Sequence, residues 1–235
     1  MTPTAPRTAA ATTTTTTAFL LALGTILLTA CSSAPKAPDW QLEAKGAMDR
    51  SVAAYLEGNT RVEQADLARA RMQLSSTGRA DLLADAELLH CAVRVASLVF
   101  EPCAGFEALR TDATAAQRAY ADYLRGQLSP SQIALLPPSQ QAAAARSATD
   151  ASTLQGIKDP LSTLVAAGVM LKTSKANPPT IAQAVDTAST QGWRRPLLAW
   201  LGVQLERATQ AGQTTEAERV QRRMKLVENE NPASR

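Results

Sequence analysis

From Asp39 onward the chain consists mainly of strong helix formers and lacks the pattern of β-strands. Ala, Leu, Gln, Arg and Glu dominate this region, and runs of alternating β-branched residues are missing from it. Apolar residues recur instead at spacings of three and four, which places them on one face of an α-helix. The sequence therefore predicts an all-α fold over residues 39–228.

Glycine, proline and capping residues divide this region into short helices. Gly58-Asn59 and Ser76-Thr77-Gly78 separate the first three helices, and Pro160, Pro178 and Pro196 lie at or near helix starts in the C-terminal half. Short helices joined by such turns predict an array of antiparallel helical hairpins. We expect helices over residues 39–56, 60–75, 80–99, 114–124, 140–146, 160–175, 178–191, 196–211 and 214–227.

Proline also marks one candidate hinge. Ser129-Pro130 and Pro137-Pro138 flank four apolar residues, which leaves room for one helical turn at most. We therefore expect an irregular hinge at residues 129–138 within a single elongated helical domain, residues 39–228. Residues 229–235 are expected to form a disordered tail.

The turn at Gly212 resembles the turn of a tetratricopeptide repeat. Ala217 follows it at the spacing of that repeat, and Leu201 and Ala208 lie where the first helix of the repeat packs. Leu205, however, stands where the repeat prefers a small residue, and no Pro follows at the usual distance. The resemblance implies a tetratricopeptide-like array, and the alternative is an irregular α-solenoid of different ancestry.

The N-terminal residues resemble the signal peptide of a bacterial lipoprotein. An apolar core over residues 18–28 runs into the tetrad Leu28-Thr29-Ala30-Cys31, which is similar to a lipobox. This core is shorter than the roughly 20 apolar residues that a membrane-spanning helix needs. The resemblance implies that residues 1–30 are removed and that Cys31 carries lipid. The alternative is an ordinary secretory signal with a chance Cys.

The same resemblance implies a location. Several acyl chains on Cys31 would anchor the chain stably, whereas one chain binds a bilayer only marginally. The next residue is Ser32, not the Asp that marks inner-membrane retention in enteric members of the family. We therefore expect the protein on the outer membrane of a Gram-negative bacterium, facing the periplasm. Residues 31–38, which contain two Pro, would form the lipidated Cys and a flexible tether.

The charge pattern argues against a nucleic-acid partner. The chain has 24 Lys and Arg against 21 Asp and Glu, and Arg7 is the only charged residue before Cys31. Charges of both signs alternate along the expected helices, as on solvated faces, and the clustered Lys and Arg of a nucleic-acid site are missing. The expected partners are the membrane, through the lipid anchor, and another protein of the cell envelope.

The chain offers few residues for catalysis or metal binding. His90 is the only His, and it lies within an expected helix beside Cys91. With Cys103 these residues would lack a fourth zinc ligand and the paired ligand spacing of a zinc site. Phosphate-binding and dinucleotide-binding loops are also missing. We therefore expect no catalytic residues, no metal and no cofactor.

Cys91 and Cys103 are the only thiols after Cys31, and export would bring them into an oxidising compartment. A disulfide requires Cα atoms within roughly 7 Å of each other, so the chain must double back near Leu98. We expect these two residues to be joined in a disulfide. The alternative is a pair of buried free thiols.

Gly192-Trp193-Arg194-Arg195-Pro196 is the most unusual polar and aromatic cluster of the chain. Trp and Arg are enriched where proteins bind one another, so Trp193, Arg194 and Arg195 are candidate partner-binding residues within a groove of the helices between Ile181 and Val227. In the alternative interpretation, Trp193 packs against the helix that Pro196 begins. Both Arg side chains then face solvent or pair with carboxylates.

Two classes of function remain. The first is a membrane-anchored periplasmic lipoprotein that acts as a non-catalytic interaction scaffold or adaptor and offers a groove to a peptide or envelope protein. The second is an accessory binding module for an envelope polymer or a small ligand, and an enzyme comes third. A groove lined by mixed polar and aromatic residues would favour the adaptor, whereas an enclosed apolar pocket with converging polar groups would favour the ligand module.

Overall fold

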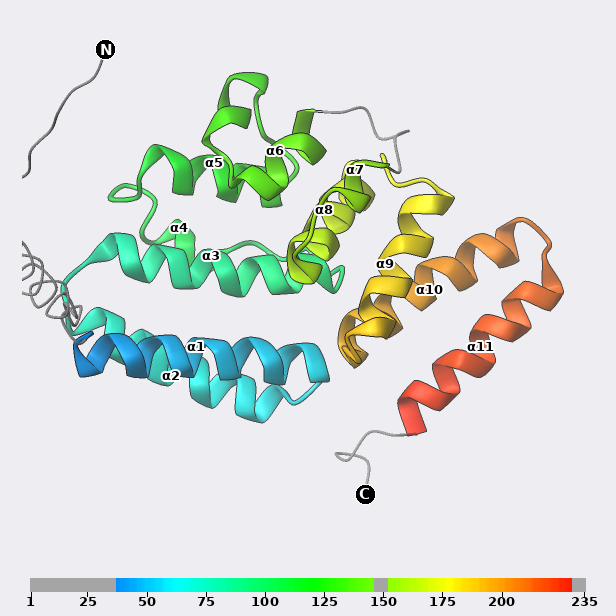
Figure 1. The fold of residues 1–235 in the computed structure, drawn as a ribbon, viewed down its shortest axis with the longest axis horizontal. Helices are drawn as coiled ribbons and strands as arrows, with labels where there is room; N and C mark the ends of the chain where they lie inside the picture. The colour runs from blue at the N-terminus through cyan, green and yellow to red at the C-terminus, as the bar shows by residue number, and fades with distance from the viewer. Residues whose placement is uncertain (1–36, 146–151, 230–235) are drawn as a thin grey trace, which may run out of the picture. The chain divides into compact units, whose positions relative to one another are not determined.

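The computed structural model describes residues 37–145 and 152–229 (Figure 1). The expected signal peptide, Cys31, most of the tether and residues 230–235 lie outside the described residues. Every regular element in the described ranges is a helix, and the helices pack against one another as contacting neighbours. The prediction of an all-α array of helical hairpins is therefore confirmed.

The elements follow one another without long connections between them. In chain order they are α1 (Asp39–Glu57), α2 (Thr60–Ser75), α3 (Ala80–Ala96), α4 (Ala104–Glu107), α5 (Ala115–Leu124), the 3₁₀ helix η1 (Pro130–Leu135), α6 (Pro138–Ala145), α7 (Ser152–Gln155), α8 (Pro160–Lys172), α9 (Pro178–Thr190), α10 (Arg194–Gln210) and α11 (Thr214–Asn229).

Local capping sets most helix boundaries close to those expected from the sequence. The side chain of Asn177, for example, accepts a hydrogen bond from the backbone N–H of Thr180 at 2.9 Å, with Pro178 at the first helical position of α9. Gly212 follows α10 with a positive φ of 68°, a conformation in which residues with a Cβ are strained.

Several segments differ from the helix ranges expected from the sequence: α4 and α7 are additional short helices, and α8 ends at Lys172 instead of residue 175. Helix α3 ends at Ala96, before the expected Val99, because Leu98 adopts a φ of 62° and turns the chain back. The backbone N–H of Val99 then donates to the carbonyl of Arg94, which closes the helix end. Residues 130–135, expected to hold one turn at most, form the six-residue 3₁₀ helix η1.

Helix α3 lies at the centre of the N-terminal half. It contacts the α1–α2 hairpin on one side, α5 on another and α8 on a third, and Figure 1 shows it between α1 and α5. A Cβ on Gly168 of α8 would collide with the backbone carbonyl of Val95, so these two helices pack at close range. The indole N–H of Trp200 donates to the carbonyl of Ala96 at 3.0 Å and attaches α10 to the end of α3.

The C-terminal helices are stacked more simply. Helix α10 packs between α9 and α11, and α1 also contacts α10. Helix α11 has a single buried apolar residue, Val220, and exposes 69% of Leu226. The array is therefore anchored most firmly around α3, α8 and α10.

No helix in the described ranges has both the length and the apolar character needed to cross a bilayer.

Candidate functional site

The structure places the Trp193 cluster at the contact between α1 and α10. Trp193 is half-buried and packs beside Tyr55, Leu56 and Val93. The Arg195 side chain donates from Nε to the carbonyl of Tyr55 at 2.7 Å and from Nη2 to Thr60 Oγ1 at 2.9 Å. Its guanidinium lies 4.3 Å from the centre of the Tyr55 ring.

These contacts give Trp193 and Arg195 a role within the fold, while partner binding by Trp193, Arg194 and Arg195 stays a prediction. The Tyr55 carbonyl lies in the last turn of α1 and accepts a hydrogen bond from the backbone N–H of Gly58 at 3.0 Å, and Arg195 adds a second donor. Trp193 and Arg195 therefore hold α10 against α1. Arg194 is half-buried as well. The structure follows the alternative interpretation in that Trp193 packs, although Arg195 contacts a carbonyl and a hydroxyl instead of a carboxylate.

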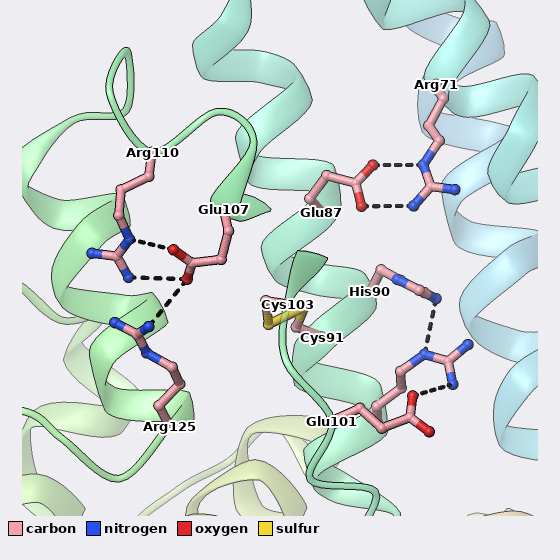
Figure 2. The surroundings of a disulfide bond; sticks show 10 residues. Arg71, Glu87, His90, Cys91, Glu101, Cys103, Glu107, Arg110 and Arg125 are labelled. Atoms are coloured by element: carbon pink, nitrogen blue, oxygen red, sulfur yellow. Dashed lines mark hydrogen bonds and ion pairs between the residues drawn. A yellow bond between two sulfur atoms is a disulfide. The ribbon is translucent and has the colours of Figure 1, made fainter. Parts of the chain in front are cut away.

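Cys91 and Cys103 are joined in a disulfide, with their Cα atoms 5.8 Å apart. Both residues are buried, and the turn at Leu98 brings the second back to α3. The bond fixes the start of α4 against α3 (Figure 2). Gly105 follows at a point where a Cβ would collide with the Glu87 carboxylate, so α4 lies directly against that side chain.

Ion pairs surround the disulfide. Arg71 of α2 donates two hydrogen bonds to the buried Glu87 of α3, at 2.5 and 2.7 Å. On the other side Arg110 and Arg125 both pair with Glu107, at 2.7 and 3.3 Å (Figure 2). These ion pairs connect neighbouring elements, and Arg71 neutralises the buried Glu87 carboxylate.

His90 belongs to the same network of polar side chains. Arg94 Nε donates to His90 Nε2 at 3.0 Å, and the buried Glu63 carboxylate lies 3.2 Å from the same nitrogen. Burial lowers the pKa of His90, the nearby Arg94 lowers it further, and Glu63 opposes the shift. The adjacent thiol, Cys91, is held in the disulfide. Among the described residues, no group of three or more His, Cys, Asp or Glu side chains is arranged to hold a metal ion.

The C-terminal helices do form a hollow, although the Trp193 cluster does not line it. A cavity of about 710 Å³ lies between α9, α10 and α11. Its lining combines small apolar residues with Gln204, Arg207, Gln213 and Glu216, and it includes no aromatic residue. This hollow therefore has a mixed polar and apolar lining, without the aromatic groups that anchor protein partners.

A second region of hollow surface lies over α3. One hollow of about 400 Å³ lies between α1 and α3, and another of about 440 Å³ lies between α3, α5 and η1. Asp85 and Leu89 of α3 line both hollows. We call the two hollows together the α3 groove. Its other lining residues include Trp40, Ala44, Met48, Leu74, Leu82 and Ala86 in the first hollow, and Leu88, Ala116, Gln117, Tyr120, Leu135 and Leu136 in the second.

Helical spacing brings these residues to one surface. Trp40, Ala44 and Met48 recur at every fourth position of α1, so they share one face of the helix. Spacings of three and four also place Leu82, Asp85, Ala86 and Leu89 on one face of α3. On α5, Ala116 and Tyr120 are four positions apart and share one face as well. One signal of the groove was that α3 carries apolar residues on more of its circumference than one packed face requires.

The charged groups at the groove are paired, with one exception. Lys45 Nζ lies 2.5 Å from Asp49, and Arg79 Nη2 lies 2.6 Å from Asp81. Asp85, between the hollows, accepts a hydrogen bond from the neutral Gln117 amide at 2.7 Å. Within the described ranges Asp85 has no ion pair. The α3 groove thus combines apolar walls, two aromatic side chains and one carboxylate without a cation.

The chain matches no protein-family model, no curated protein and no solved structure.

Proposed function

We propose that this protein is a membrane-anchored, non-catalytic interaction scaffold of the cell envelope, and that its α3 groove binds a segment of another protein. The observation that carries the proposal is the composition of the groove. Apolar side chains with Trp40 and Tyr120 form its walls, and polar groups at Asp85 and Gln117 lie between them. The cores of protein interfaces are enriched in aromatic residues, and the exposed Lys45, Asp49 and Arg79 of the first hollow correspond to the polar rim of such an interface.

The form of the groove favours a macromolecular partner over a small ligand. Small-molecule sites surround most of their ligand within a concave pocket, whereas the two hollows here lie on either side of α3 and share Asp85 and Leu89 as a common border. Leu135 is 42% exposed at its edge. A chain segment can occupy both hollows at once, whereas a small ligand would fill one of them.

The proposed anchor is the lipid on Cys31. A tether over residues 31–38 would reach roughly 20 Å when extended, which holds the helical array near the inner face of the outer membrane. The scaffold would then present the α3 groove to proteins of the periplasm or of the membrane itself. Both the lipid anchor and the outer-membrane location are inferred from the resemblance of residues 18–31 to a lipoprotein signal.

The polar groups of the C-terminal hollow support the second candidate function, an accessory module for an envelope polymer or small ligand. Gln204, Gln210 and Gln213 supply amides and Arg207 a cation along its 710 Å³. Such groups can hydrogen-bond to hydroxyl-rich or anionic ligands. Binding of envelope polysaccharide that is lost on Gln213→Ala, with no effect from changes at the α3 groove, would favour this function.

Site-specific photocrosslinking in intact cells tests the scaffold. A photoreactive residue at Ala116 or at Leu135, both exposed in the groove, should yield discrete adducts with a second protein. The same residue at Asp186, exposed on α9 outside the groove, provides the matched control. Adducts from the two groove positions that the control does not give support the proposal. Equal adducts at all three positions, or none, contradict it.

A further inference from the structure

We propose that the segment bound in the α3 groove is an amphipathic α-helix with a Lys or Arg between two apolar residues, and that this basic residue pairs with Asp85. The inference rests on the proposed function and specifies the chemistry of its partner.

The α3 groove consists of two hollows with a ridge between them. Asp85 and Leu89 are one helical turn apart on α3 and line both hollows, so they form a ridge between them. Packed helices place such a ridge into the groove of the facing helix. A partner that crosses the ridge must therefore insert one side chain into each hollow.

The width of α3 sets the spacing of the side chains that can enter the two hollows. A helix with its side chains is about 10–12 Å wide, so the two hollows on either side of α3 are separated by a similar distance. With a rise of 1.5 Å per residue, positions i and i+7 of a partner helix are about 10 Å apart on one face. Recognition of helices in grooves uses anchors at this spacing. Apolar residues at i and i+7 therefore fit the two hollows.

The helical walls of the groove determine which backbone conformation the partner can use. An extended peptide gains affinity by adding a strand to the exposed edge of a sheet. The surface of the α3 groove is built from helices α1, α3 and α5 and the 3₁₀ helix η1, whose backbone groups are already paired internally. Side-chain packing must supply the affinity, and a helix presents the required side chains with its own backbone satisfied.

The carboxylate of Asp85 determines which charge the partner should carry. Lys45 and Arg79, the cations of the first hollow, already pair with Asp49 and Asp81. Asp85 has only the Gln117 amide among the described residues, and water solvates it while the groove is open. A partner that covers the ridge removes that water, and an uncompensated carboxylate is costly to bury. A cation at i+3 or i+4, between the two anchors, offsets this cost.

Synthetic peptides can test the spacing and the charge separately. The probe is a helical peptide of roughly 15 residues, stabilised by a side-chain staple because shorter isolated helices are marginal in water. It carries Leu at i and i+7 and Lys at i+3, and its matched control has Glu in place of the Lys. Binding to the full-length chain in detergent micelles is followed by the anisotropy of a label on the peptide.

The Lys peptide should bind roughly tenfold or more tightly than the Glu peptide, the difference expected for about 1.4 kcal/mol or more. Asp85→Asn should reduce this preference, and Asp85→Lys should reverse it in favour of the Glu peptide. Asp186→Asn, which removes an exposed carboxylate outside the groove, should leave the preference unchanged. Asp85 is exposed, and circular dichroism of each variant checks that the fold is retained.

Equal affinity for the two peptides, binding of neither, or a preference that survives Asp85→Lys in a folded variant would overturn the proposed partner chemistry. If groove-specific crosslinks still form at Ala116 and Leu135, the failure concerns only the basic helix, and the scaffold stands. If those crosslinks are missing too, the groove itself is not the binding surface.

Discussion

At the residue scale, the network around His90 links stability to pH. The groups that face it are Glu63 and Arg71 on α2 and Glu87 and Arg94 on α3. Burial and the Arg94 guanidinium lower the pKa of His90 below its ordinary value near 6.5, so the folded protein binds a proton less readily than the unfolded chain. Stability must therefore fall as the pH drops through about 6.5.

We expect the urea midpoint of unfolding to decrease between about pH 7.5 and 5.5, because His90 is the only side chain of the protein whose ordinary pKa lies in this window. His90→Gln keeps a neutral acceptor near Arg94 and should flatten the pH dependence. Circular dichroism at several pH values gives the midpoints. A slope that is the same in both proteins would show that other groups determine it.

Arg71 and Glu87 show how single residues support the network. Hydrogen bonds to Glu87 and its charge raise the pKa of Arg71 above its already high value, so the Arg71 guanidinium stays charged. Because Glu87 is buried, removal of its cation would leave an uncompensated charge. The pair therefore fixes α2 on α3 whatever the protonation state of His90.

At the element scale, the contact between α1 and α10 depends on Arg195. Its two hydrogen bonds and its position over the Tyr55 ring join helices that are far apart in the sequence. Arg195→Ala should lower the free energy of unfolding by about 1–3 kcal/mol, since it removes two hydrogen bonds and the packing of the guanidinium on the Tyr55 ring. Chemical denaturation measures this loss.

Arg222→Ala on α11 is the matched control. Arg222 is exposed and makes one long ion pair, 3.8 Å from Glu218, so its loss should change stability by less than about 1 kcal/mol. If Arg195→Ala were equally mild, its contacts would not hold α10 on α1.

The positions of the elements along the chain could be predicted well, because the signals for them are local. Caps such as Asn177 and turns such as Gly212 act within a few residues. The early end of α3 could not be predicted, since Leu98 adopts a positive φ that few non-glycine residues accept. The tertiary contacts and the disulfide around it maintain that conformation.

At the scale of the whole molecule, the proposed anchor can be tested independently of the groove. Cys31→Ser should abolish incorporation of a labelled fatty acid and leave the precursor uncleaved, because the acceptor thiol is lost. Cys91→Ser combined with Cys103→Ser is the matched control, and it should retain labelling because these residues are joined to each other. Metabolic labelling followed by immunoprecipitation gives the answer. Labelling that persists in Cys31→Ser would exclude the lipoprotein assignment.

The sequence by itself determined the all-α class, the order of the helices and most of their ends, because helical periodicity and capping depend on neighbours within one or two turns. The tertiary structure alone decided what the exposed and half-buried residues do. Arg195 meets Tyr55 across 140 positions of sequence, and Asp85 is flanked by two hollows only because α1 and α5 pack on opposite sides of α3. Which helix faces meet is set by the packing of all the helices together, and no local pattern of residues records it.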